Sequence, residues 1–386
     1  MTLRDQIETV LRSWDTYETG CGAPAIIDYD CHPDTTGTVP AARDRRDIRD
    51  HLQRLHDHAT AEGDSTLIER LDADIAYCDA LLGTTRPFAD YLHATQGCAA
   101  TGWSADYLDH RRTLAIDALR DAGIAWGPAT RDELAQAEGV LSTEKTAEAA
   151  RQAVTDYESA VRQATGATAT YEVDIETVDT DGYWAYWLDG AGQHARLRIN
   201  RRGPAFTKVR ARQCALHEIL GHAAQYAALA QRCNTEDVPW VRLLSVHANH
   251  QVLFEGLAQA LPLFVTPNDH ELALRVRLDH YLQLVRAQLH LAVADGLPDA
   301  QIAETARAQV PFWTDEQITD MITDRRDNPQ LRSYLWSYPA GIDWFVTLAE
   351  TENAPHEQVL HAAYHAPLSP RDLAALWPDG PPIGGR

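Results

Sequence analysis

Two histidines and a glutamate stand close together in one of the most apolar stretches of the chain. Residues 214–230 read CALHEILGHAAQYAALA, in which the strongly polar side chains are His217, Glu218, His222 and Gln225. A helix that is apolar on nearly every side is buried, and burying a carboxylate beside two imidazoles is costly unless something compensates. A divalent metal ion would compensate, because neutral imidazoles bind it and the glutamate can hold its water. The stretch therefore predicts a zinc site on a buried helix.

The spacing of the two histidines requires a change in that helix. In a regular α-helix, residues five apart lie about 140° apart around the axis, so His217 and His222 could not both reach one ion. A single π-turn adds one residue to the turn, and such turns occur mostly at functional sites. We expect it near Gly221, where an extra residue is tolerated best.

The segment His217–His222, HEILGH, resembles the HExxGH element of dipeptidyl peptidase III and the HExxxH element of the microtubule-associated tyrosine carboxypeptidases. Both are gluzincins, metallopeptidases whose third metal ligand is a glutamate on the next helix. The resemblance implies that this ligand is Glu255, within VLFEGLA at 252–258, which is similar to the Glu-Gly-x-Ala element of the clan. His217, His222 and Glu255 would then hold one Zn²⁺ per chain and leave one position open for water.

A second resemblance concerns Tyr334 and Tyr338, in RSYLWSYPAG at 332–341. This segment is similar to an Arg-x-Tyr…Pro-Gly segment in a bacterial family of uncharacterised helical metalloproteins. That family carries HExxPGH and Glu-Gly-Trp-Ala elements in the same order, although its helix motif is one residue longer. The resemblance implies that Tyr334 or Tyr338 donates its hydroxyl to a tetrahedral intermediate; an aromatic core position is the alternative for both.

His247 and His250 are further candidates, because we expect one helix over 240–261 to carry them together with Glu255. His247 precedes Glu255 by eight residues, about 80° around such a helix, so it could face the same cleft. There it could act in catalysis, by stabilising an oxyanion or orienting a ligand. A hydrogen-bonded position between helices is the structural alternative for either histidine.

Other residues compete for the metal. The segment from His356 to His361, HEQVLH, also spells HExxxH, but it lies among polar residues and no apolar-wrapped acid follows it. A solvated helix face is the better interpretation. Cys214 stands three residues before His217 and could be a ligand, although a packed core cysteine is favoured.

The rest of the sequence must position these side chains, and it reads as mostly helical. Residues 1–166 form a predicted N-terminal helical region, residues 167–350 a catalytic region, and residues 351–386 C-terminal helices and a tail. In the first region, a Pro/Gly/Asp-rich loop at 20–40 suggests a lid or a surface wrap. Apolar spacing of three or four residues predicts helices over 2–17, 41–62, 65–82, 104–121, 142–165 and 268–294.

A small sheet is predicted immediately before the metal helix. Alternating apolar and polar residues, with turn signals at Asp181-Gly182 and Gly190-Ala191-Gly192, indicate three strands in an antiparallel meander, at 168–178, 183–188 and 195–200. Gluzincins have a sheet in this position, so the resemblance implies an edge strand that binds an extended substrate through its main chain. The predicted fold class is mainly α with a small antiparallel β-sheet, in a gluzincin-like metallopeptidase architecture.

Composition excludes several classes of partner. The net charge of −22 argues against nucleic acid and against an anionic membrane surface. The N-terminus has no apolar signal region, and no stretch approaches the roughly 20 apolar residues that cross a bilayer, which favours a cytoplasmic location. The six cysteines form no CxxC pair and are interpreted as reduced thiols.

Together these patterns predict a zinc-dependent hydrolase of an amide or peptide bond in a peptide or peptide-like small molecule. Glu218 would take a proton from water and pass it to the leaving amine. The alternative is a non-hydrolytic metal enzyme, such as a lyase or an oxidative tailoring enzyme, since two histidines and a carboxylate also suit Fe²⁺. A binding protein without catalysis is a third interpretation, which the presence of Glu218 disfavours. The sequence leaves open the substrate, endo or exo cleavage, and the oligomeric state.

Overall fold

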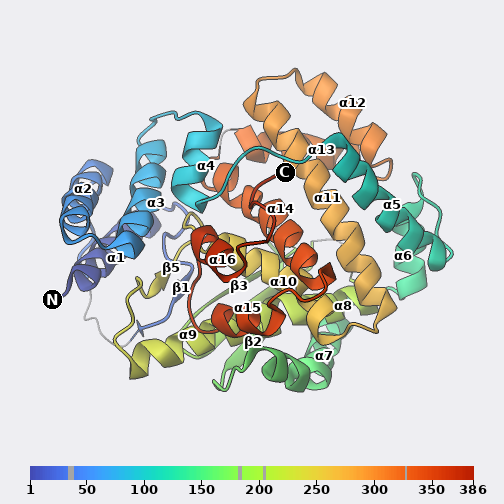
Figure 1. Cartoon of the computed structure of the whole chain (residues 1–386), viewed down its shortest axis with the longest axis horizontal. Coiled ribbons are helices and arrows are strands. Elements are labelled where there is room, and N and C mark those ends of the chain that lie inside the picture. The colour runs from blue at the N-terminus through green and yellow to red at the C-terminus, as the bar shows by residue number, and fades with distance from the viewer. Residues whose placement is uncertain (34–38, 181–184, 203–205, 327) are drawn as a thin grey trace.

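Helices make up most of this computed structural model, which describes residues 1–386 apart from 34–38, 181–184, 203–205 and 327 (Figure 1). The helices predicted from periodicity are present, with ends that differ by a few residues. Among the described residues, no helix is both long and apolar enough to cross a bilayer. In chain order the helices are α1 (Leu3–Gly20), α2 (Arg45–Glu62), α3 (Ser65–Leu81), α4 (Phe88–Gln96), α5 (Ala105–Asp121), α6 (Thr130–Glu138), α7 (Thr143–Thr165), α8 (Lys208–Cys214), the π-helix η2 (Ala215–Ala223), α9 (Ala224–Thr235), α10 (Gln251–Val265), α11 (His270–Ala294), α12 (Asp299–Gln309), α13 (Asp315–Arg326), α14 (Pro329–Glu350), α15 (His356–Ala363) and α16 (Pro370–Leu376).

The small sheet is present, but it is mixed and has five strands in the order β2-β4-β3-β1-β5. Strands β2 (Glu172–Val178), β3 (Tyr186–Ala191) and β4 (His194–Asn200) lie where the sequence predicts them. The predicted antiparallel meander is wrong, because β2 pairs in parallel with β4, and only β3 and β4 form an antiparallel hairpin. Gly192, with φ of 61°, allows the tight turn of that hairpin. The turn predicted at 181–182 lies outside the described residues.

The N-terminal loop supplies a strand to this sheet. Within the loop predicted as a lid or wrap, β1 (Tyr29–Asp30) pairs in parallel with Gly190 and Ala191 of β3. On its other side β1 pairs in antiparallel register with β5 (Leu243–Leu244). The loop therefore ties the first helices to the middle of the chain, and it places Asp28 beside β3.

The predicted helix over 240–261 is wrong in its first half. Its apolar start, Leu243 and Leu244, forms β5, and α10 begins only at Gln251. The pairing of β5 with β1 satisfies backbone groups that a helix would otherwise satisfy. His247 and His250 therefore precede the helix of Glu255, and the angular argument that related His247 to Glu255 does not hold.

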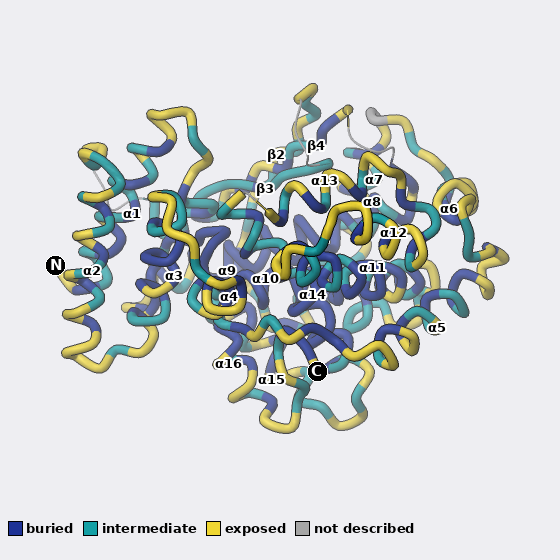
Figure 2. Tube along the Cα trace, turned by 90° about the horizontal axis from the view of Figure 1, so that it is seen from above, coloured by how far each residue is buried: buried dark blue, intermediate teal, exposed yellow. Residues whose placement is uncertain are grey.

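Buried side chains form three main clusters around these elements. The largest surrounds η2, α9, α10 and α14 and one face of the sheet, and the traces of α10 and α14 are mostly buried in the middle of Figure 2. A second lies between α5, α11, α12 and α13, and a third between α1, α2 and α3. The first 166 residues thus contribute to all three clusters. The domain boundaries after residues 166 and 350 stay predictions.

Helices α10 and α14 cross at a contact between two glycines. A Cβ on Gly256 would lie 2.5 Å from backbone atoms of Gly341, and one on Gly341 would lie 2.4 Å from the carbonyl oxygen of Val252. Since real Cβ atoms do not come this close, both positions require glycine for the helices to approach. The crossing brings Glu255, next to Gly256 on α10, close to the tyrosines of α14.

Candidate metal centre

The predicted π-turn is confirmed by η2, which spans both histidines between α8 and α9. The Nε2 atoms of His217 and His222 lie 3.2 Å apart in the structure. A Cβ on Gly221 would lie 2.9 Å from the carbonyl oxygen of Leu216 and 3.0 Å from the Cβ of Ala258 on α10, so this position requires glycine for α10 to approach. The wider turn therefore directs both imidazole rings to one place, and the absence of a side chain at Gly221 leaves room for α10.

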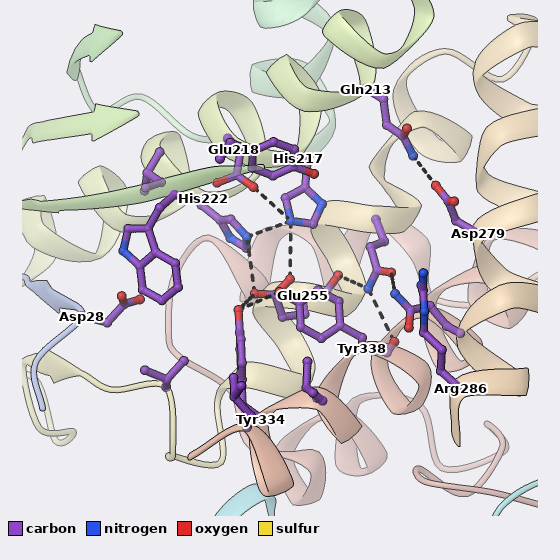
Figure 3. Close-up of a pocket in the computed structure, with 18 of the residues that line it drawn as sticks. Asp28, Gln213, His217, Glu218, His222, Glu255, Asp279, Arg286, Tyr334 and Tyr338 are labelled. Carbon is purple, nitrogen blue, oxygen red and sulfur yellow. Dashed lines mark hydrogen bonds and ion pairs between the residues drawn. The ribbon is translucent and has the colours of Figure 1, made fainter. Parts of the chain in front are cut away.

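Glu255 of α10 completes this group (Figure 3). Its carboxylate oxygens lie 3.4 Å from Nε2 of His217 and 3.9 Å from Nε2 of His222. Tetrahedral Zn²⁺, with bonds of about 2.0–2.1 Å, separates its ligand atoms by about 3.3 Å. Glu255 Oε2 and His222 Nδ1 are also buried without a hydrogen-bond partner among the described residues. Two imidazole nitrogens and a carboxylate that converge in this way fit a zinc ion.

Glu218 lies on the other side of the His217 ring nitrogen from Glu255 (Figure 3). Its Oε1 is 3.5 Å from His217 Nε2. One potential ligand atom each from His217, Glu218 and His222 lies within 4.8 Å of the others. Glu218 is therefore close enough to act on a molecule bound between the histidines while Glu255 holds the opposite side.

Burial controls the charges of this cluster. Burial lowers the pKa of His222 to about 3, so that its imidazole is neutral, as a metal ligand must be. Burial raises the pKa of Glu218 to about 7; His217 opposes that rise and Glu255 adds to it. For Glu255, burial acts to raise the pKa, but the close contact with His217 and the hydrogen bond from Tyr334 hold it below its usual range. Glu255 is thus the carboxylate that stays ionised beside the imidazoles.

Two tyrosines of α14 face the same carboxylate. The hydroxyl of Tyr334 donates to Glu255 Oε1 at 2.5 Å, and the hydroxyl of Tyr338 lies 2.7 Å from that of Tyr334. Burial raises the pKa of both tyrosines, so each keeps its proton as a hydrogen-bond donor. The structure therefore brings both predicted tyrosines to the centre, one turn apart on their helix.

A cavity of about 320 Å³ opens at this cluster. The predicted residues that line it are His217, Glu218, His222, Glu255, Tyr334 and Tyr338. The sequence interpretation missed four charged residues in the same lining: Asp28, Arg210, Asp279 and Arg286. Asp28 lies in a loop without periodicity and Arg210 on the short helix α8, so no local pattern marks either residue; Arg286 lies within an apolar stretch of α11, at 281–294, which could have indicated its burial.

His247 does not line this cavity and is not part of the centre. Its Nε2 lies 2.9 Å from Asp74 Oδ1, and its ring stacks on Tyr77 with centroids 4.4 Å apart. It is fully buried against α1 and α3. The structural alternative, a hydrogen-bonded histidine between helices, describes it. His250 is likewise buried, and its Nε2 accepts from the backbone of Ser245.

The competing segment lies elsewhere. His361 and Glu357 are exposed on α15, and His356 Nε2 lies 2.6 Å from the carbonyl oxygen of Leu348. Both histidines line a shallow surface depression with no other metal-ligating side chain than Glu357 among the described residues. Cys214 is buried and does not line the cavity at the candidate metal centre.

Comparison with known proteins gives a fold likeness only. No protein-family model matches the chain, and no curated protein does. Among solved structures, the chain is similar to "the putative lipoprotein from Colwellia psychrerythraea", with a TM-score of 0.59 and 13% sequence identity. The match covers 86% of this chain and 65% of that one, so the chain spans less than two thirds of its length. At this identity the likeness shows a shared fold alone.

Proposed function

We propose that this protein is a zinc-dependent hydrolase that cleaves an amide bond in a peptide or peptide-like small molecule. The observation that carries the proposal is the convergence of His217, His222 and Glu255, with Glu218 beside them, at one cavity. Three protein ligands with a vacant fourth position are typical of catalytic zinc sites. The gluzincin resemblance, carried by the same residues, points to peptide chemistry.

Each polar side chain has a role in this reaction. A bound zinc ion supplies a water of lowered pKa and polarises the carbonyl of the substrate. Glu218 takes the proton of the attacking water and passes it to the nitrogen of the leaving amine as the C–N bond breaks. The products are a carboxylic acid, which keeps the oxygen of the water, and an amine.

Tyr338 and Tyr334 are suited to stabilise the carbonyl oxygen as it gains negative charge. Their hydroxyls are neutral donors in a buried setting, where hydrogen bonds to developing charge are strongest. Tyr334 already donates to Glu255, whereas the Tyr338 hydroxyl contacts that of Tyr334. We therefore assign the contact with the substrate oxygen to Tyr338, and to Tyr334 the positioning of Glu255 and Tyr338.

An unpaired edge of the sheet favours a substrate with a peptide backbone. On the side away from β4, β1 pairs only with the last two residues of β3. Among the described residues, Tyr186–Asp189 have no strand partner on that side, and Tyr186, Trp187 and Leu188 line the cavity. An extended segment can add its main-chain hydrogen bonds there.

Isotope labelling during turnover tests the reaction class. Purified protein is analysed for zinc, then incubated with a panel of dipeptides and acyl-amino acids in water enriched in ¹⁸O. We expect zinc-dependent release of an amine and of an acid that carries ¹⁸O. A product formed without solvent oxygen indicates a lyase, and consumption of dioxygen indicates oxidative chemistry with Fe²⁺; either result rejects hydrolysis.

The cytoplasmic location remains a prediction of the sequence.

A further inference from the structure

The cavity at the metal centre carries opposite charges at its two ends. Figure 3 shows Asp28 on one side of Glu255, and Arg286 and Asp279 on the other. Asp28 comes from the N-terminal loop, whereas Arg210 and Arg286 come from α8 and α11. The three residues are distant in sequence and meet only around this cavity.

The carboxylate of Asp28 has no hydrogen bond or ion pair among the residues that the structure describes. Its backbone N–H donates to Leu244 at 2.8 Å, which fixes the residue beside β5. The neighbouring carboxylates differ: Asp30 pairs with Arg12, and Asp189 pairs with Arg196. Burial raises the pKa of Asp28 to about 7, and the charges of Glu255, Asp189 and Glu218 add to this. Asp28 is half-buried, and a carboxylate that lines a cavity without a partner among the described residues is ionised more readily when a cation binds beside it.

Asp28 also lies where the cavity meets a second hollow. This hollow, of about 630 Å³, shares Asp28, Trp187 and Val246 with the inner cavity. The rest of its lining comes from the loop before β1, from β3 and β4, and from the start of α14. A ligand that enters the inner cavity through this hollow therefore passes the Asp28 carboxylate.

At the other end of the cavity, Arg210 and Arg286 also lack an ion-pair partner among the described residues. Within the described part of the chain, the guanidinium groups of Arg210 and Arg286 have no hydrogen bond or ion pair with another side chain. Arg286 lies over the ring of Trp313 at 5.5 Å. Burial lowers the pKa of Arg286; Asp279 opposes this and Arg210 adds to it. The guanidinium groups of Arg210 and Arg286 therefore lie near a single carboxylate, that of Asp279.

That carboxylate does not neutralise the arginines. Asp279 accepts a hydrogen bond from Gln213 at 2.7 Å and is not within ion-pair distance of Arg210 or Arg286 among the described contacts. By contrast Arg212, on the same helix as Arg210, pairs with Asp269 at 3.0 Å and Glu271 at 2.9 Å. The charge left over on this wall is positive and faces the cavity.

We propose that the substrate is a short peptide with two free ends, whose ammonium group is bound by Asp28 and whose carboxylate is bound by Arg210 and Arg286. The planar donor fork of arginine matches a carboxylate, and an ammonium is a compact partner for a single aspartate. The metal centre between the two ends is where the amide bond of such a peptide lies. This inference rests on the proposed function for its choice of a peptide.

Blocked dipeptides test the inference by binding. The zinc-loaded Glu218→Gln protein is titrated calorimetrically with Ala-Phe, N-acetyl-Ala-Phe, Ala-Phe amide and N-acetyl-Ala-Phe amide. Hydrogen bonds to charged groups imply a loss of about tenfold or more in affinity for each blocked end. The same ratios are expected in kcat/KM for the wild type.

Variants assign each end to its residues. Asp28→Asn is expected to abolish the preference for a free over an acetylated amino group and to keep the preference for a free carboxylate. Arg286→Gln and Arg210→Gln are expected to do the reverse, and Arg286→Lys to restore part of the carboxylate preference. The matched controls are Asp30→Asn and Arg212→Gln, whose side chains are paired elsewhere and line neither cavity, so their selectivity should equal that of the parent.

The outcomes separate this inference from the proposed function. Hydrolysis of all four compounds at similar kcat/KM overturns the inference and leaves the hydrolase standing. Binding that requires both free ends, without hydrolysis by the zinc-loaded wild type, supports the ligand and overturns the hydrolase. Absence of binding by all four compounds overturns the inference, as does a loss of selectivity in the control variants equal to that in Asp28→Asn and Arg286→Gln.

Discussion

The same six-residue pattern, HExxxH, occurs twice in this chain in different surroundings. In η2, residues 217–222 are buried, their helix is a π-helix, and the two Nε2 atoms lie 3.2 Å apart. In α15, residues 356–361 lie on an ordinary α-helix, and Glu357 and His361 are exposed. Since residues five apart diverge by about 140° on an α-helix, the second pair cannot meet at one ion. The HExxxH motif alone therefore does not identify a metal site; the type of helix and the burial of the side chains distinguish the two copies.

What converts one copy into a candidate metal centre is the packing around it. The hydroxyl of Tyr364 donates to the carbonyl oxygen of Leu220 at 2.6 Å, inside the π-helix, where the widened turn changes backbone pairing. Helix α10 packs against Gly221 and brings in Glu255. The copy in α15 has neither a glycine at the corresponding position, which is Leu360, nor a facing acid among the residues that line its depression.

The largest difference is expected in metal content. His217→Ala, His222→Ala and Glu255→Ala should each reduce bound zinc from about one ion per chain to near zero, because each removes one of three ligands. His361→Ala, the matched change in the second copy, should leave it unchanged. Elemental analysis of the purified proteins measures this. A chain that loses its zinc with His361→Ala and keeps it with His217→Ala would reverse the assignment.

The next largest effect is expected on turnover. Glu218→Gln should keep zinc but lower kcat by about 10²–10⁴-fold, since glutamine preserves volume and cannot accept the proton. Glu357→Gln should have no effect on kcat, because Glu357 is exposed on α15. Both variants are assayed for zinc and for amide hydrolysis. Retention of more than about a tenth of the activity in Glu218→Gln would remove this residue from the mechanism.

A smaller effect is expected on stability at the residue that the second copy lacks. Gly221→Ala should lower the free energy of unfolding by about 1–3 kcal/mol, because its Cβ meets Leu216 and Ala258 in a packed interior. Gly127→Ala is the control, with no atom within 4 Å of the added Cβ and no positive φ, and should change stability by less than about 0.5 kcal/mol. Urea denaturation of the metal-free proteins gives both values. Equal stabilities would mean that α10 does not need its close approach to η2.

The last comparison concerns the pH dependence of stability. Burial lowers the pKa of His222 to about 3, against about 6.5 for an unfolded histidine. As pH falls below about 6.5, the unfolded chain takes up this proton and the folded chain does not, so the stability of the metal-free protein declines towards about pH 3. His222→Gln should remove part of the decline, whereas His361→Gln, at an exposed position, should not. Urea denaturation at several pH values checks this, and equal flattening by the two variants would contradict it.

Much of the centre could be predicted because its signals are local. The apolar wrapping of His217, Glu218 and Glu255 indicates burial, and burial of such groups indicates compensation. The five-residue spacing forces a widened turn whatever the rest of the fold, and η2 confirms it. The helices and the positions of β2, β3 and β4 follow from periodicity in the same way.

The pairing of strands could not be predicted locally. An alternating segment is equally suited to a parallel or an antiparallel neighbour, and the parallel pairing of β2 with β4 depends on the path of the chain between them. Likewise, Leu243 and Leu244 read as the start of a helix until β1, which comes from the N-terminal loop, pairs with them. Because of that pairing, His247 lies before α10 and not, as the sequence predicts, on one helix with Glu255.

The sequence by itself determined the candidate ligands, the π-turn and the candidate base, because those properties follow from residue type, spacing and the cost of burying charge. Only the tertiary structure decided which charged residues share the cavity. Asp28, Arg210 and Arg286 come from a loop and two helices far apart in the chain. Their opposition across the metal centre exists only after the sheet and helices have packed, since it depends on distances in space and not on spacing along the chain.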